Sequence, residues 1–279
     1  MPPRIAIPMP HSIDLEYAER AIPQYERAVT QAGGEPVRIP LDQTSADVMK
    51  ILERCAAVLL PGSKADIDPA RFGAPRSAHT ATADPLRDAV DELLLQDAYT
   101  LRKPVLGICY GLQSLNVYHA GSLIQHIPDF LPEDLRSRVN HEAGKKIAVA
   151  HAVEIQDDSR LAQVLCGDSH LRLSMGAKLG GVDGRGFSRM AGKSDGTVGS
   201  YSESKFTLPV NSSHHQSADK IGEGLRISAR CPDDGIIEAL EGTAPDHFVL
   251  AVQWHPERSI DTDEPSRAIF RALIDAAST

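Results

Sequence analysis

Short apolar runs and amphipathic segments alternate along the first half of the chain. Four apolar runs are typical of buried strands and cover residues 4–7, 36–39, 56–60 and 105–108. The segments between them place apolar side chains every three to four residues, which predicts helices over residues 17–29, 46–54, 84–101 and 112–120. This alternation predicts an α/β protein with an open, mostly parallel sheet that carries helices on both faces.

The second half of the chain is richer in strands. Its strand-like segments cover residues 147–155, 225–231, 235–241 and 248–254. The turn Asp233-Asp-Gly235 connects two of them, so we expect additional antiparallel strands here. An amphipathic helix follows at about residues 264–276. Because no linker-like boundary separates the two halves, we predict one domain over residues 1–279.

One stretch combines a buried strand, two glycines and a cysteine: Pro104-Val-Leu-Gly-Ile-Cys-Tyr-Gly-Leu-Gln-Ser-Leu-Asn116. Gly107 and Gly111 flank Cys109 and a helical segment follows, which is the strand–turn–helix pattern of a nucleophile elbow. The helix N-terminus at such a turn favours the thiolate over the thiol. The alternative is a small cysteine buried in the core. The pattern predicts a nucleophile if the chain also supplies a base.

A candidate base lies near the other end of the chain. Residues 248–254 predict a strand that leads into His255-Pro256-Glu257. Pro256 favours an extended conformation at His255, and two-residue periodicity then puts His255 and Glu257 on the same side. A carboxylate in that place orients the imidazole and stabilises its charged form. The triplet alone is more often a surface turn at a strand end, but together with Cys109 it predicts a Cys-His-Glu triad.

The composition limits which binding partners and which cellular compartment are compatible with this chemistry. The chain has 279 residues, a net charge of −9 and no cluster of lysine and arginine, so we expect no nucleic-acid-binding surface. No apolar run is long enough to cross a membrane, and the N-terminus is typical of a strand rather than a secretion signal. The four cysteines include no close-spaced pair that would indicate a zinc or redox motif. We therefore expect a cytoplasmic protein with reduced thiols.

The motifs around the predicted triad resemble those of a known superfamily. Gly107-x-Cys109-x-Gly111-x-Gln113 and Gln253-Trp-His-Pro-Glu257 are similar to motifs of the class I glutamine amidotransferases. Further stretches resemble the peptidase C26 family, in particular its γ-glutamyl-γ-aminobutyrate hydrolases. They are Leu59-Leu-Pro-Gly-Ser63 with Asp66-Ile-Asp-Pro69 and Phe72-Gly73, Asp84-Pro-Leu-Arg-Asp88, and Asn211-Ser-Ser-His-His-Gln216. The resemblance extends over about residues 4–270 and implies a flavodoxin-like fold of the amidotransferase type.

The resemblance also implies roles for individual residues. Cys109 would attack the γ-carbonyl of a small γ-glutamyl amide such as γ-glutamyl-γ-aminobutyrate, with His255 as base and acid and Glu257 as its orienting group. Water would then hydrolyse the γ-glutamyl thioester to give glutamate and an amine. The backbone amides implied for the oxyanion are those of Gly62 and Tyr110. The side chains implied for holding the glutamyl group are those of Gln113, His214, His215 and Gln216. No cofactor and no metal ion are implied.

Two features depart from the C26 pattern. Position 110 is a tyrosine, where the hydrolases more often have arginine, and it is expected beside the pocket for the leaving group. The segment at about residues 167–204 is rich in glycine, serine and charge and resembles an insertion, since the family is usually shorter there. Its Gly-Arg-Gly and Gly-Lys-Ser sequences lack the strand context and spacing of a phosphate-binding loop. We interpret it as a disordered loop, a lid or an oligomer contact.

Two other functions compete with the hydrolase. A glutaminase subunit would use the same triad on glutamine and deliver ammonia to a separate synthase partner, but the signature at residues 211–216 favours the hydrolase. A catalytically retired γ-glutamyl-binding protein is disfavoured because Cys109, His255 and Glu257 are all present. A papain-like protease carries its cysteine in a different local sequence near the N-terminus. We expect a small-molecule substrate and no nucleic-acid or membrane partner, and the resemblance is compatible with a homodimer.

Overall fold

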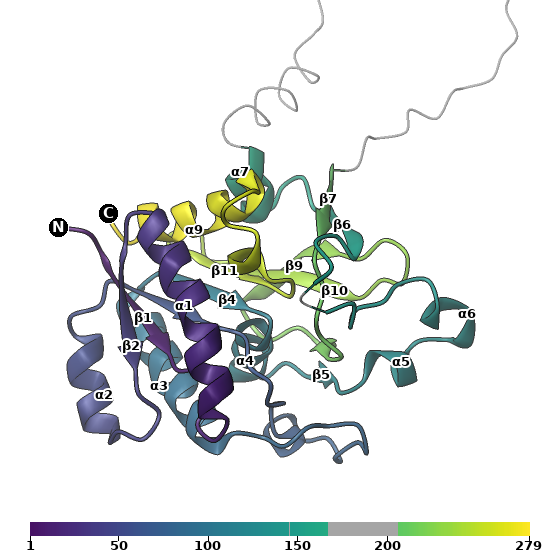
Figure 1. Ribbon diagram of the computed structural model, residues 1–279, viewed down its shortest axis with the longest axis horizontal. Coiled ribbons are helices and arrows are strands. Elements are labelled where there is room, and N and C mark those ends of the chain that lie inside the picture. The colour runs from purple at the N-terminus through teal and green to yellow at the C-terminus, as the bar shows by residue number, and fades with distance from the viewer. Residues whose placement is uncertain (145, 167–205) are drawn as a thin grey trace, which may run out of the picture.

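A nine-stranded mixed sheet organises the protein, with its strands in the order β2-β1-β3-β4-β11-β10-β9-β6-β7 (Figure 1). The computed structural model describes residues 1–144, 146–166 and 206–279. The predicted Gly-rich insertion at 167–204 therefore lies outside the described residues. Among the helices that are described, none has the length and apolar character needed to cross a membrane.

Five neighbouring strands of the sheet are parallel. They are β2 (Glu35–Ile39), β1 (Arg4–Pro8), β3 (Ala57–Leu60), β4 (Val105–Ile108) and β11 (Val249–Val252). The other four strands extend the sheet in antiparallel pairing: β10 (Ile237–Gly242), β9 (Leu225–Arg230), β6 (His151–Ile155) and β7 (Phe206–Val210). A separate two-stranded sheet pairs β5 (Leu123–Ile124) with β8 (Ser217–Ala218). The predicted parallel sheet with an antiparallel extension is confirmed.

Helices cover both faces of the parallel part, as the alternation of apolar patterns predicts. One face packs against α1 (Leu15–Gln31), α7 (Arg160–Cys166) and α9 (Glu264–Ala276). The opposite face packs against α2 (Ser45–Leu52), α3 (Pro85–Leu101) and α4 (Tyr110–Tyr118). Shorter helical turns lie in the connections: η1 (Pro69–Phe72), α5 (Ile127–Phe130), α6 (Glu133–Arg136) and η2 (Pro256–Arg258).

The centre of the sheet decides where chemistry can occur. Every residue of β3, β4 and β11 is buried, because helices cover these strands on both sides. The three strands are neighbours and parallel, so their carboxyl ends meet at one edge of the sheet. Ligand sites of open α/β sheets form at this edge. Here it gathers Gly62 after β3, Cys109 after β4 and His255 after β11.

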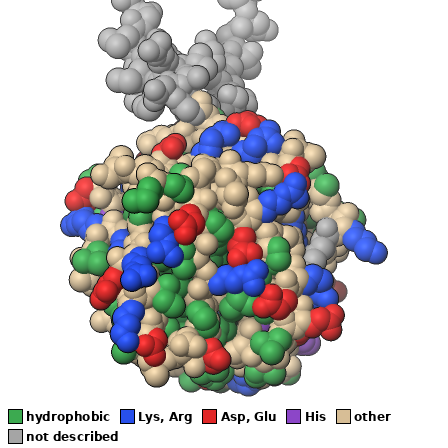
Figure 2. Space-filling view, turned by 60° about the vertical axis from the view of Figure 1, so that its left-hand side comes forward, with side chains coloured by type: hydrophobic (Ala, Val, Ile, Leu, Met, Phe, Trp, Pro, Cys, Tyr) green, Lys and Arg blue, Asp and Glu red, His purple; other side chains and the backbone are tan. Residues whose placement is uncertain are grey.

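The surface carries charge of both signs. On the described part of the face in Figure 2, lysine and arginine side chains lie interspersed with aspartate and glutamate, without a continuous basic stripe. Surface charges of the protein form exposed ion pairs, such as those of Arg38 with Glu19 and Glu26. Exposed pairs of this kind contribute little to stability.

Candidate active site

Cys109 occupies a sharp turn between a buried strand and a helix. β4 ends at Ile108 and α4 begins at Tyr110, so this one residue makes the whole connection. Its backbone has φ 54° and ψ −104°, in the left-handed half of conformational space that residues with a Cβ rarely adopt. Strain of this kind persists only where the surrounding structure enforces it, and it is concentrated at functional sites. The geometry is that of the predicted nucleophile elbow.

The two flanking glycines are required by close backbone approach. A methyl group on Gly111 would lie 2.2 Å from the carbonyl oxygen of Leu60 in β3. A methyl group on Gly107 would lie 2.8 Å from the carbonyl oxygen of Gly111. The amide of Cys109 also donates to the carbonyl of Val252, which ties the turn to β11 (N···O 2.8 Å). Any larger residue at either glycine would push the elbow off the sheet.

The predicted base and its orienting acid form a direct pair. Nδ1 of His255 lies 2.8 Å from Oε1 of Glu257, and both side chains are buried. Because a carboxylate can only accept, Nδ1 carries the proton and Nε2 is left as the basic nitrogen. The pair forms for a different reason from the predicted one. Residues Pro256–Arg258 make a 3₁₀ turn rather than an extended strand end, and this turn folds the carboxylate back to the ring.

Asn211 fixes the backbone of His255. Its amide group donates to the carbonyl of His255 (Nδ2···O 2.9 Å) and accepts from the amide of His255 (N···Oδ1 3.0 Å). Asn211 is buried at the end of β7, in the stretch that resembles the C26 signature. The role of this asparagine was not predicted from the sequence. The signature could have suggested it, since a buried asparagine can satisfy both backbone groups of a single residue.

Cys109 and His255 meet in a cavity of about 310 Å³ that both residues line. A methyl group on Gly62 would lie 3.0 Å from Cε1 of His255 and 3.6 Å from Cβ of Cys109, so both side chains approach the same point above this glycine. The structure therefore brings together Cys109, His255 and, through the ring, Glu257. It can support nucleophilic attack by sulfur with proton transfer to and from an imidazole.

Burial sets the protonation of the pair. It raises the pKa of the Cys109 thiol to about 12, and the guanidinium of Arg258 counteracts only part of that shift. Burial also lowers the pKa of His255, although the carboxylate of Glu257 opposes the effect. A neutral thiol beside a neutral imidazole is the result at neutral pH. Burial of Cys109 therefore opposes the thiolate that the helix N-terminus is expected to favour.

The two backbone N–H groups that are predicted to stabilise the oxyanion have different partners in the structure. The N–H of Tyr110 interacts with the sulfur of Cys109 and lowers the pKa of the thiol. The N–H of Gly62 instead donates to the hydroxyl of Tyr25 (N···Oη 3.1 Å). Tyr25 is buried in α1. A substrate oxygen must take the place of this hydroxyl before Gly62 can stabilise an oxyanion.

The side chain of Tyr110 is held by α3. Its hydroxyl donates to Oδ1 of Asp88 at 2.5 Å, and the guanidinium of Arg87 lies 4.8 Å from the centre of its ring. Arg87 is fully buried, pairs with Asp91 (Nε···Oδ1 2.6 Å) and donates to the carbonyl of Pro61 (Nη2···O 2.7 Å). The Asp84-Pro-Leu-Arg-Asp88 stretch therefore positions both the residue before Gly62 and the residue after the nucleophile. Tyr110 lines the cavity, where its side chain brings no positive charge.

The four residues expected to hold a glutamyl group all line the cavity: Gln113, His214, His215 and Gln216. One side-chain nitrogen of each is already hydrogen-bonded within the protein. Nε2 of Gln113 donates to the carbonyl of Gln216 at 3.3 Å, and Nε2 of His215 lies 3.0 Å from Oδ1 of Asp66. His214 turns Nδ1 to the carbonyl of Gln216 and Nε2 to Glu238, so neither nitrogen faces the cavity. Their binding of a substrate stays a prediction.

Several cavity residues were missed from the sequence. Lys64 and Arg258 line the cavity and give it positive charge, and Tyr17 and Asp66 complete that part of the wall. Lys64 directly follows the Leu59–Ser63 stretch and Arg258 directly follows the His255–Glu257 pair. The position of these two residues next to a recognised motif is the sequence feature that could have identified them as cavity residues. Among the described residues, the side-chain groups that could hold a metal ion lie outside the Cys109–His255 pair.

Comparison with known proteins identifies the family. The sequence profile of peptidase C26 matches residues 9–208 and 189–257 of the chain. The chain belongs to the peptidase C26 family. It is a glutamine amidotransferase-like hydrolase.

Two relatives of this C26 chain carry different activity names. A protein of Mycobacterium tuberculosis named as a glutamine amidotransferase is 35% identical over 257 residues, which cover 91% of this chain and 66% of that protein. The chain thus spans just under two thirds of that relative. The γ-glutamyl-γ-aminobutyrate hydrolase PuuD of Escherichia coli is 28% identical over 257 residues, which cover 91% of this chain and 84% of the hydrolase.

Solved structures agree with the C26 assignment at the level of the fold. A GMP synthase component of Thermoplasma acidophilum matches with a TM-score of 0.57 at 14% identity, over 100% of this chain and 95% of that one. PurLQS of Thermotoga maritima matches with a TM-score of 0.55 at 15% identity, over 99% of each chain. The C26 chain thus shares their α/β architecture.

Proposed function

We propose that this C26 protein is a cysteine-dependent hydrolase that cleaves the γ-glutamyl amide bond of a small γ-glutamyl compound. One observation carries the proposal: a cysteine on a strained elbow lines the same cavity as a histidine that is paired with a buried glutamate. A cysteine that served only the core would not require the left-handed backbone that Cys109 adopts.

In the proposed mechanism, Nε2 of His255 removes the thiol proton as sulfur attacks the γ-carbonyl carbon. A neutral starting pair fits this role, since the imidazole is unprotonated and able to act as the base. The imidazolium then gives the proton to the leaving amine, which leaves a γ-glutamyl thioester on Cys109. Water, activated by the same imidazole, hydrolyses the thioester to glutamate. Glu257 keeps the ring oriented and stabilises its charged form.

The oxyanion of each tetrahedral intermediate would accept from the N–H of Tyr110. The N–H of Gly62 would join after the hydroxyl of Tyr25 gives way to the substrate oxygen. Loss of one such donor typically costs about 10²–10³ in rate. The glycine at position 62 fits the role, because any side chain there would press on His255 and on the hydroxyl of Tyr25.

The cavity favours an anionic substrate. Lys64 and Arg258 contribute positive charge to its wall. Asp66 lies there too, but its hydrogen bond raises the pKa of His215, and a protonated His215 balances the charge of that carboxylate. A γ-glutamyl compound brings one carboxylate, and a leaving group such as γ-aminobutyrate brings a second. A cavity of about 310 Å³ is at the small end of the range for ligand sites, which fits a short substrate. We therefore propose that the leaving amine carries a carboxylate.

The alternative is a glutaminase subunit that supplies ammonia to a synthase partner. The mycobacterial relative named as a glutamine amidotransferase favours this alternative. In that case free glutamine would be the substrate and the protein alone would be slow. The hydrolase is preferred because the charged cavity suits a substrate with two carboxylates better than glutamine, which has one carboxylate and releases ammonia.

The test is the release of glutamate from a panel of γ-glutamyl amides and free glutamine. Purified protein is compared with Cys109→Ala, which removes the nucleophile and keeps a small buried side chain. Cysteine-dependent turnover of a γ-glutamyl amide with an anionic leaving group, together with poor use of glutamine, is the expected result. Weak turnover of glutamine alone would favour the glutaminase. No turnover of any compound would contradict both.

A further inference from the structure

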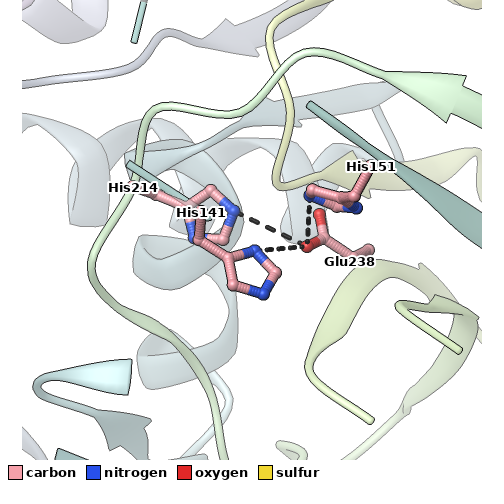
Figure 3. Close-up of side chains that lie close together, drawn as sticks. All are labelled: His141, His151, His214 and Glu238. Atoms are coloured by element: carbon pink, nitrogen blue, oxygen red, sulfur yellow. Dashed lines mark ion pairs between the residues drawn. The ribbon is translucent and has the colours of Figure 1, made fainter. Parts of the chain in front are cut away.

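Three histidines and a glutamate gather beside the catalytic cavity, at a place that the mechanism does not use (Figure 3). They are His141 after α6, His151 at the start of β6, His214 between β7 and β8, and Glu238 in β10. All four side chains are at least 97% buried. This cluster is referred to below as the His₃Glu cluster.

The ligand atoms of the His₃Glu cluster point to a common centre. Nδ1 of His141, Nε2 of His151 and Nε2 of His214 lie 3.2, 3.4 and 3.6 Å from Oε1 of Glu238. Within the described part of the chain, none of these nitrogens has a hydrogen-bond partner, and neither oxygen of Glu238 has one. Buried polar atoms are nearly always satisfied, so four unpartnered atoms within 4.8 Å of one another, with a fifth on the same carboxylate, indicate a missing group.

The outer nitrogens of the three rings show which inner nitrogens are free to coordinate. Nε2 of His141 lies 2.8 Å from Oδ2 of Asp234, Nδ1 of His151 lies 3.1 Å from the carbonyl of Ala152, and Nδ1 of His214 lies 2.9 Å from the carbonyl of Gln216. All three partners are oxygen acceptors, so each outer nitrogen carries its proton. A neutral ring then presents a lone pair inward. This outer bond to a carboxylate or carbonyl is the usual arrangement of metal-bound histidines.

The spacing of the inner atoms suits zinc. Tetrahedral Zn²⁺ with bonds of about 2.0–2.2 Å places its ligand atoms about 3.3–3.6 Å apart. The three nitrogen–oxygen distances of 3.2 to 3.6 Å cover this range, and all four ligand atoms lie within 4.8 Å of one another. From this geometry we propose that the His₃Glu cluster is a four-coordinate site for a divalent transition-metal ion, with zinc as the best match.

Charge supports a divalent ion over an ion-pair cluster. The carboxylates of Glu238 and Asp234 are both fully buried, and two positive charges are needed to balance them. One protonated histidine would supply a single charge and leave two imidazole lone pairs facing a carboxylate oxygen. A divalent ion balances both carboxylates and turns every lone pair into a ligand. The donor set of three imidazoles and one carboxylate fits zinc among the common ions.

Four protein ligands make the site closed, so its role is structural. The ion would join two loops to β10: the one that carries His141 and the one between β7 and β8 that carries His214. Residues 213–216 of the second loop line the catalytic cavity. Metal binding would therefore order one wall of that cavity. This consequence for catalysis rests on the proposed function, whereas the binding of the ion does not.

The direct test measures metal on full-length protein without an affinity tag. The protein is stripped by chelator dialysis, and Zn²⁺ is titrated against a competing chelator. The same titration on Cys109→Ala excludes binding by the catalytic thiol. We expect one zinc ion per chain by elemental analysis in both proteins. Co²⁺ in place of zinc should give the intense visible absorption of a tetrahedral site. A folded protein that takes up no metal overturns the proposal.

Ligand variants locate the ion. Asp234 binds the outer nitrogen of His141, and loss of such a partner typically weakens metal binding about 10–100-fold, which is the range expected for Asp234→Asn. His151→Ala and Glu238→Gln remove ligands of the ion, so each should weaken binding by more than about 100-fold. His79→Ala is the control, since His79 belongs to an exposed His–His–Asp group and should leave binding unchanged. Zinc affinity that survives both ligand variants would refute the site. If these variants do not fold, metal binding by Asp234→Asn and by the metal-stripped wild-type protein still tests the proposal. Zinc binding without hydrolase activity would refute only the proposed function.

Discussion

The backbone clamp of Asn211 on His255 allows a sharp test of how the base is held. In Asn211→Ala, the amide of His255 loses its partner inside the protein, whereas its carbonyl keeps the amide of Arg258 as a donor (N···O 3.2 Å). An unsatisfied buried backbone group costs about 1–3 kcal/mol, so the change should lower the free energy of unfolding by about that amount. The base would also shift, and a misplacement of about 1 Å at a catalytic group costs about 10² in rate.

Asn116 is a matched control for this change. It is fully buried in α4, donates to the carbonyls of Ser122 and Lys220, and accepts from the amide of Gly222. Asn116→Ala therefore removes a similar set of backbone contacts, but from a residue that does not line the cavity. We expect a comparable loss of stability with little loss of kcat.

The two variants are compared by urea unfolding and by steady-state kinetics on the best γ-glutamyl substrate, at a temperature where both are folded. The expected result is a kcat at least about 10²-fold lower in Asn211→Ala than in Asn116→Ala at similar stability. If the two variants lose kcat equally, the clamp stabilises the fold without positioning the base. A normal kcat in Asn211→Ala would refute the reasoning entirely.

The elbow and the protonation of the site lead to three more expected outcomes. Gly111→Ala puts a methyl group 2.2 Å from the carbonyl oxygen of Leu60, and overpacking of this kind costs about 1–3 kcal/mol or more of stability. The Tm of the variant in a thermal melt should therefore be lower than that of the parent. An unchanged Tm would contradict the tight turn. Because burial lowers the pKa of His255, the imidazole is already neutral at pH 7. We expect kcat/KM to fall only when the pH drops below the ordinary pKa of histidine, about 6.5. A kcat/KM that falls between pH 8 and pH 7 would contradict this assignment. Tyr25→Phe removes the hydroxyl that accepts from the N–H of Gly62, so kcat should stay the same or rise. Loss of an oxyanion donor typically lowers the rate by about 10²–10³. A fall of that size in Tyr25→Phe would show that the hydroxyl itself takes part in catalysis.

The sequence predicted those parts of the site that depend on local pattern. The elbow at Cys109 follows from an apolar run, two glycines and an amphipathic helix that are contiguous in the chain. The pairing of His255 with Glu257 also came from adjacent residues, although the structure achieves it through a 3₁₀ turn. The sheet was predictable because buried parallel strands have continuous apolar sequences.

What the sequence did not show depends on burial and on distant contacts. The thiolate was expected from the helix dipole, but desolvation, which has no sequence pattern, dominates the pKa of Cys109. The engagement of Gly62 by Tyr25 joins the loop after β3 to α1, which no local rule connects. The His₃Glu cluster draws its ligands from four separate segments, and its histidines have none of the close spacing that marks a zinc motif.

The position of β11 in the sheet has a consequence for the order of folding during synthesis. This strand comes late in the chain, yet it lies between β4 and β10, and Val249 pairs with Val105. Contacts of such long sequence separation form slowly. The amide of Cys109 is anchored to Val252, so the strained elbow cannot be set while β11 is still missing. A nascent or truncated chain would therefore hold an ordinary cysteine, and the reactive arrangement arises only when the last strand completes the sheet.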